Sequence, residues 1–186
     1  MKYLFSFILL CCAYLGIKGQ NFNSVECVAT DENKYSVTNI EISISKEKIS
    51  VYSIKNKTLI NQIPTSSNGK EVNHKFLYNK KLQQGFLFLE KHTELSEGCD
   101  VYKVEKGDIK YLCEFPFAAY TSENGERMNY NNILPYLSVI RSDKRTLLFI
   151  NTPIVVSYPN SPKEEILETK SFYHILTDKG FELRNY

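Results

Sequence analysis

Apolar and polar residues alternate one by one along most of this chain, which is the pattern of half-buried β-strands rather than of helices. Residues 40–45 read Ile-Glu-Ile-Ser-Ile-Ser, and in the next run Ile49 and Val51 alternate with Ser50 and Tyr52. Further strand-like runs occupy 59–63, 72–78, 86–90, 99–104, 109–115, 146–150, 154–158, 172–176 and 181–184. Turn residues recur about every ten positions, so the sequence predicts an all-β fold, mainly an antiparallel sandwich or barrel of about ten strands.

Helical signals are few, and they predict one or two short helices. Ser161 can accept a hydrogen bond from a first-turn amide, Pro162 suits the first helical position, and Glu164 can reach back to the cap. These three residues predict a helix over 161–168. A second short helix is expected over 133–138, which has a proline in its first turn.

The segment 116–132 contains few apolar residues and an Asn-Gly pair, so we expect it to be a long exposed loop. Long loops of compact domains often carry a function. Tyr120, Arg127, Tyr130 and Arg141 lie in or near this segment and could bind an anion or a sugar. The sequence therefore offers them as a possible binding loop.

The start of the chain is built like a secretory signal peptide. Lys2 precedes an apolar run over 3–15, and Gly19 has the small side chain that signal peptidases need. The expected cut after Gly19 divides the chain into a signal peptide over 1–19 and a single β-rich domain over 20–186. We therefore expect the protein to be secreted or to lie in a periplasmic or other extracytoplasmic compartment.

The apolar run of about 13 residues is shorter than the roughly 20 that a membrane-spanning helix needs. No membrane span is expected after cleavage, because no second long apolar run follows. Cys11 and Cys12 lie inside the run, and a bacterial lipoprotein would attach lipid to such a residue. That chemistry needs a small residue before the cysteine, whereas Leu10 precedes Cys11, so a lipid anchor is the less favoured alternative.

The charges of the chain are balanced, with 23 basic and 21 acidic residues. Lys2 and Lys18 belong to the expected signal peptide, so the remaining chain has equal numbers of the two. A nucleic-acid-binding protein needs a basic surface to displace counterions, and this balance argues against one. It argues equally against binding an anionic membrane by net charge alone.

Two cysteines flank a predicted hairpin. The three-residue loop 105–107 has glycine last, as such loops prefer, so Val104 is expected to face Asp108. Continued pairing places Cys99 opposite Cys113 at a position where side chains are closest. Export permits oxidation, and the sequence therefore predicts a structural disulfide between Cys99 and Cys113.

Asn56-Lys57-Thr58 is an acceptor sequence for N-linked sugar. It falls on a predicted hairpin turn, where a glycan has room. Asn56 is therefore a possible glycosylation site in a host that glycosylates.

Motifs of enzymatic catalysis or cofactor binding are missing. The sequence contains no Gly-x-Ser-x-Gly elbow, no phosphate-binding glycine loop and no His-Glu-x-x-His pair. His74, His92 and His174 are too far apart in sequence to share one helical turn, so neither a metal nor a cofactor is expected. Cys27, left without a partner, is expected to be a buried free thiol.

The sequence leaves three classes of function open. The favoured class is an exported, non-catalytic binding module that recognises a protein or a carbohydrate partner, including an inhibitor or toxin-neutralising protein. The alternative is a lipocalin-like barrel that carries a small apolar ligand. The chain is similar to that family in size and class alone, since it has no tryptophan for the family's Gly-x-Trp signature. A hydrolase with an unrecognised site is the second alternative.

The signal peptide yields a direct prediction. The exported protein should begin at Gln20, or within a few residues of it. Intact-mass and amino-terminal analysis of the exported fraction measure this, and a full-length chain retained in the cytosol would contradict it.

Overall fold

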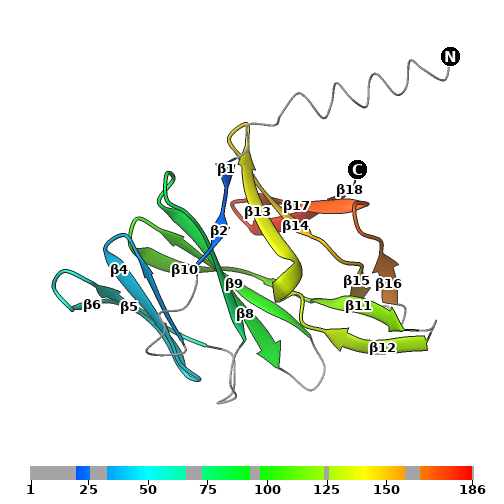
Figure 1. Ribbon diagram of the computed structural model, residues 1–186, viewed down its shortest axis with the longest axis horizontal. Helices are drawn as coiled ribbons and strands as arrows, with labels where there is room; N and C mark the ends of the chain where they lie inside the picture. Colours follow the sequence, from blue (N-terminus) through cyan, green and yellow to red (C-terminus); the bar gives the residue numbers. More distant parts are fainter. Residues whose placement is uncertain are drawn as a thin grey trace.

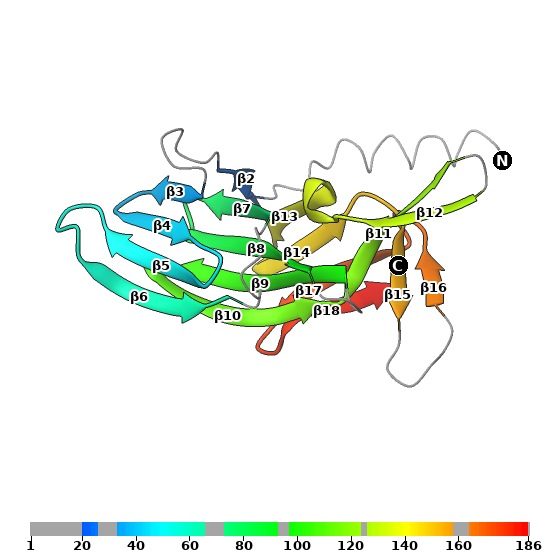
Figure 2. The same cartoon turned by 90° about the horizontal axis from the view of Figure 1, so that it is seen from below.

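The computed structural model describes residues 20–25, 33–65, 73–92, 97–123, 126–157 and 164–185. This part of the chain forms eighteen strands, all paired antiparallel, and one 3₁₀ turn. The predicted all-β class is confirmed, although the strands are more numerous than expected. They form four open sheets stacked as a sandwich and do not close into a barrel (Figures 1 and 2).

The sheets at one end of the molecule are two antiparallel meanders. The outer sheet consists of β3 (Lys34–Val37), β4 (Ile40–Ile44), β5 (Lys48–Ser53) and β6 (Leu59–Pro64) in chain order. The central sheet has the order β10-β9-β8-β7-β2, with β2 (Asn23–Ser24), β7 (His74–Asn79), β8 (Gln84–His92), β9 (Glu97–Glu105) and β10 (Asp108–Phe115). Figure 2 shows the two meanders side by side.

The carboxyl-terminal half supplies most of the other two sheets. The distal sheet has the order β1-β13-β14-β17-β18, with β1 (Gln20–Asn21), β13 (Leu137–Ser142), β14 (Arg145–Ile150), β17 (Phe172–Thr177) and β18 (Gly180–Asn185). The end sheet has the order β12-β11-β15-β16, with β11 (Phe117–Glu123), β12 (Glu126–Asn131), β15 (Ile154–Ser157) and β16 (Glu164–Leu167). The 3₁₀ turn η1 (Leu134–Tyr136) leads into β13.

The central sheet is buried on both faces. Phe86 and Phe88 of β8 point into a hydrophobic core shared with the distal and end sheets, whereas Leu87 and Leu89 point into a second core shared with the outer sheet. All four side chains are almost fully buried. A strand buried on both faces has no polar alternate positions, which explains why these four apolar residues are consecutive.

The outer sheet follows the alternating pattern of its sequence. Ile42 and Val51 are paired across β4 and β5, and both side chains are fully buried against the central sheet. Glu41 and Tyr52, the pair one position along, lie on the solvent face. The polar half of the alternation is therefore the exposed face of this sheet.

The β9–β10 hairpin corrects the predicted register. The turn contains two residues, Lys106 and Gly107, so Val104 pairs with Ile109 and not with Asp108. Lys106 and Gly107 both have positive φ, of 52° and 86°, which is the requirement of the tight turn that matches strand twist.

The predicted disulfide is not present, and Cys99 and Cys113 are free thiols. An irregularity between Tyr111 and Cys113 shifts the register again, so Cys113 lies opposite Val101 and Cys99 opposite Phe115. The two sulfurs are thus diagonal neighbours rather than a facing pair. Burial raises the pKa of both thiols, and at Cys99 the neighbouring Cys113 adds to the effect, so neither is an activated nucleophile.

Three further predictions from local sequence signals, one loop and two helices, differ from the structure, because strand pairing includes residues of these segments. The expected loop over 116–132 is largely the β11–β12 hairpin, whose strand β11 also pairs with β15. The expected helix over 161–168 is wrong where it is described, since Glu164–Leu167 pair with β15 as strand β16. So short a helix is marginal without packing support. In 133–138, only the 3₁₀ turn is helical.

Side-chain truncation in β8 tests the two cores separately. Phe86→Ala should lower the free energy of unfolding by about 3–5 kcal/mol and Leu87→Ala by about 2–5 kcal/mol, because each removes fully buried apolar volume. Ser36→Ala on the exposed face should change it little. Urea unfolding provides the values, and a near-neutral Leu87→Ala would show that the outer sheet does not cover this face.

Candidate functional site

The solvent face of the outer sheet carries a broad recess of about 490 Å³. Neighbouring strands contribute its residues: Glu41 is paired with Tyr52 across β4 and β5, and Lys34 with Ser43 across β3 and β4. The complete lining is Lys34, Glu41, Ser43, Tyr52, Ser53, Ile54 and Lys57. The recess is thus formed by the outward set of the alternating strands and by the start of the β5–β6 turn.

The lining combines one aromatic ring with charged and neutral hydrogen-bonding groups. Glu41 contributes only acceptors when ionised, lysine ammonium groups contribute only donors, and serine hydroxyl groups contribute both. Tyr52 adds a flat apolar surface with a polar tip. Such a set suits a ligand that has an apolar face and many hydroxyl groups.

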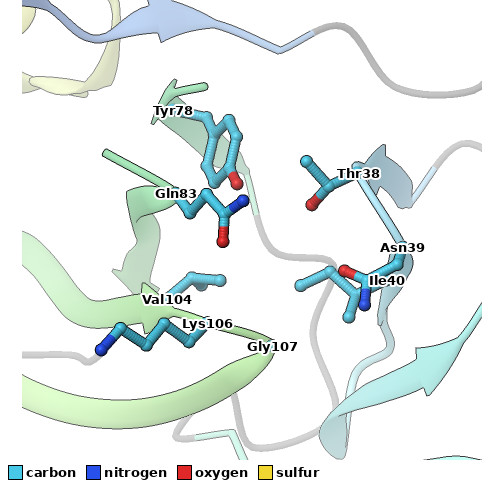
Figure 3. A pocket seen from close by; sticks show the side chains of 8 residues that line it. All are labelled: Thr38, Asn39, Ile40, Tyr78, Gln83, Val104, Lys106 and Gly107. Carbon is cyan, nitrogen blue, oxygen red and sulfur yellow. The ribbon is translucent and has the colours of Figure 1, made fainter. Parts of the chain in front are cut away.

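A smaller pocket of about 90 Å³ opens where the outer and central sheets meet at their turns (Figure 3). Three hairpin turns line it, with Thr38 and Asn39 from β3–β4, Gln83 from β7–β8, and Lys106 from β9–β10. The backbone N–H of Lys106 donates to the Gln83 carbonyl at 3.3 Å and joins two of these turns. Since one water occupies about 30 Å³, the pocket holds a few waters and is too small for a sugar or a lipid chain.

His74 links the outer and central sheets. The Tyr35 hydroxyl donates to its Nδ1 at 2.6 Å, and its Nε2–H donates to the Asn33 side-chain oxygen at 2.9 Å. Burial lowers the pKa of His74, in keeping with a neutral ring held by both partners. Because both nitrogens are engaged, His74 cannot accept a proton from a substrate unless Tyr35 moves. His74 therefore helps to hold the outer and central sheets together.

His174 lies in the core between the central, end and distal sheets. Only 1 % of its surface is exposed, and neither ring nitrogen has a hydrogen-bond partner. The rings of Phe115, Phe117 and Phe172 surround it, with centroids 5.0, 5.5 and 5.9 Å away. Burial lowers the pKa of His174 to about 4, so the imidazole is neutral at pH 7. No substrate can reach it in this conformation.

The residues of the expected binding loop belong to two different sheets. Tyr120, Arg127 and Tyr130 belong to the β11–β12 hairpin of the end sheet, and the side chains of Arg127 and Tyr130 lie outside the described part. Arg141 belongs to β13 of the distal sheet, where its Nη1 donates to Thr146 Oγ1 at 3.1 Å. Pairing of β11 with β12 places Tyr120 on the strand next to that of Arg127 and Tyr130, whereas Arg141 lies in a different sheet.

The structure describes some, but not all, of the other residues that the sequence indicated. Asn56 lies exposed on the β5–β6 turn, which confirms the predicted hairpin position, and its glycosylation stays a prediction. Cys27 lies outside the described residues, as does the side chain of His92. The recess itself was missed, although Glu41, Ser43 and Tyr52 are the polar positions of the alternating runs that predicted these strands.

The comparisons with known proteins add no relative. No protein-family model, curated protein or solved structure matches this chain. Within the described ranges, no group of three His, Cys, Asp or Glu side chains could hold a metal ion. None of the helical structure in these ranges is long and apolar enough to cross a membrane.

His174 predicts a specific pH dependence of stability. Its pKa is about 4 when folded, against about 6.5 unfolded, so the unfolded chain binds one more proton between these values. The free energy of unfolding should fall by about 3 kcal/mol as pH decreases from 7 to 4.

The variant His174→Leu should lack this component, while His74 and the carboxyl groups contribute equally to both proteins. Urea unfolding at a series of pH values measures the difference between them. A difference that stays constant with pH would contradict the assignment.

Proposed function

We propose that the protein is an exported, non-catalytic binding protein that recognises a carbohydrate through the recess on the solvent face of its outer sheet. The supporting observation is the composition of that recess, in which the Tyr52 ring lies among hydrogen-bonding side chains. A pyranose ring presents C–H groups on one face and hydroxyl groups around its edge. The first suit an aromatic ring, and the second suit carboxylate, ammonium and hydroxyl partners.

The form of the recess favours a saccharide over a large protein partner. It lies on a sheet whose inward positions are anchored by Ile42 and Val51, so the outward side chains are held at fixed spacing. A preformed site binds with a smaller ordering cost. A protein interface of standard size needs about 800 Å² on each partner with a desolvated apolar centre, whereas Tyr52 and Ile54 are the only large apolar residues that line the recess.

The two alternatives have less support from the fold. A lipocalin-like carrier needs a closed barrel with an empty interior, whereas the described sheets are open and both faces of the central sheet are covered by packed side chains. A hydrolase needs an accessible base beside a nucleophile. Of the two histidines whose side chains are described, His74 has both nitrogens engaged and His174 is buried.

The proposal is tested by measuring binding of the protein to a panel of immobilised oligosaccharides, followed by calorimetry on those that bind. Tyrosine variants are compared with the parent protein in both measurements. Tyr52→Ala should weaken binding by about tenfold or more, since it removes the aromatic surface. Tyr111→Ala is the matched control, because Tyr111 is 52 % exposed but lies on β10 of the central sheet.

Binding of no saccharide, or equal losses in the two variants, would overturn the proposal. Stoichiometric capture of a protein from the exported fraction, lost in Tyr52→Ala, would instead assign the recess to a protein partner.

A further inference from the structure

The β5–β6 hairpin exposes three large aliphatic side chains. Ile54, Leu59 and Ile60 are 44 %, 51 % and 49 % exposed, and they lie within seven residues of one another around a single turn. Both views of the molecule place this hairpin at the extreme end of the long axis (Figures 1 and 2). A cluster of exposed aliphatic groups at a protruding tip marks a surface that contacts something apolar.

Lysines accompany these aliphatic residues. Lys55 and Lys57 lie in the same turn, and residues 53–60 contain no acidic residue. Three more lysines lie at the same end of the sheets: Lys80 and Lys81 on the β7–β8 turn and Lys106 on the β9–β10 turn. The β7–β8 and β9–β10 turns line the small pocket of Figure 3 together with the β3–β4 turn, and the Ile54 N–H at the β5–β6 turn donates to the Asn39 carbonyl of the β3–β4 turn at 2.9 Å. All five lysines are exposed, and no ion pair joins them to a described residue.

Two acidic groups that border these turns have basic partners, and a third, Glu41, lines the same recess as Lys57. Glu105 is paired with Lys103 at 2.8 Å, and Asp108 with Lys110 at 3.5 Å. Lys106 also helps to lower the pKa of Glu105, so the turn lysines without an ion-pair partner among the described residues are Lys55, Lys57, Lys80 and Lys81. The whole chain, by contrast, has a formal net charge of only +2. The fold thus concentrates positive charge at one end of a nearly neutral chain.

We propose that the β5–β6 hairpin docks the protein on the surface of an anionic phospholipid bilayer. In this arrangement Ile54, Leu59 and Ile60 enter the boundary between headgroups and acyl chains, while Lys55 and Lys57 meet the headgroup phosphates. Apolar burial and attraction to anionic lipid act together in peripheral membrane binding. Lys80, Lys81 and Lys106 add to the attraction at longer range, within the limit set by ionic screening.

The combination of side chains favours a lipid surface over other anionic partners. A nucleic acid or an acidic polysaccharide would also attract lysines, but neither gains from three aliphatic side chains that lack an aromatic ring for stacking. The acceptor residue Asn56 lies between Lys55 and Lys57. A glycan there would cover the tip, so glycosylation and bilayer docking exclude each other.

Vesicle co-sedimentation tests the proposal. Protein from cells that express the full chain should bind vesicles of equal parts phosphatidylcholine and phosphatidylglycerol and should not bind phosphatidylcholine alone. Lys55→Glu with Lys57→Glu should weaken binding by about thirtyfold or more, since each lysine near an anionic surface contributes about fivefold. Ile54→Ser with Leu59→Ser and Ile60→Ser should weaken it by about tenfold or more.

Control variants carry changes of the same kind elsewhere. Lys48→Glu with Lys179→Glu alters the charge by the same amount away from the tip, and Ile166→Ser with Tyr111→Ser removes two other exposed apolar groups. Both controls should bind within about twofold of the parent protein. Every protein carries Asn56→Gln so that no sugar shields the hairpin, and circular dichroism confirms that each is folded.

Four results would overturn the proposal: no binding of the parent protein, equal binding to phosphatidylcholine alone, equal losses in the controls, or full competition by soluble glycerol phosphate. Self-association through the hairpin, detected by sedimentation equilibrium and lost in the serine variant, would also overturn it. Ile54 and Lys57 belong to both the recess and the tip, whereas Tyr52 belongs to the recess alone, so the Tyr52→Ala saccharide test distinguishes failure of one proposal from failure of the other.

Discussion

Burial of the central sheet on both faces is the constraint on which the rest of the structure depends. The side chains of β8 alternate between two cores, with Phe86 and Phe88 on one side and Leu87 and Leu89 on the other. Each core needs a covering sheet, because apolar side chains exposed over such an area would cost several kcal/mol each in hydration. The outer sheet covers one face, and the distal and end sheets cover the other. The layers therefore exist because one strand has no polar face to present to water.

Polar groups between these layers determine where function can be located. His74 is held by Tyr35 and Asn33 at the contact of the outer and central sheets, and His174 lies among aromatic rings in the opposite core. Both rings contribute to packing in this conformation. A binding site is therefore expected among residues on the outer surface of the sandwich. The solvent face of the outer sheet and the β5–β6 turn present polar and aliphatic side chains to solvent. Both features belong to the outer sheet, where Glu41 and Tyr52 lie on the face opposite the buried Ile42 and Val51.

Sequence reasoning succeeded where the signal was local and failed where it required long-range pairing. The alternation in 40–45 predicted a half-buried strand, and Ile42 within it is fully buried. The hairpin at Gly107 was recognised, but a turn shorter by one residue and an irregularity near Leu112 moved Cys99 away from Cys113. The segment 116–132 lacked apolar alternation, and its strands depend on pairing with β15. The recess was not found because its residues come from three strands whose adjacency the sequence does not state.

The sequence by itself determined the all-β class, most strand positions and, in alternating runs such as 40–44, the side that faces inward, because side chains of an extended backbone alternate with a fixed period of two. Only the tertiary structure decided the register of β9 and β10, the stacking of the sheets and the free state of the two thiols, since these depend on contacts between residues far apart in the chain. It also decided that lysines from separate turns meet at one end beside exposed aliphatic groups. Overall composition averages charge over the whole chain, whereas folding separates it in space, so a nearly neutral sequence can present a strongly basic tip.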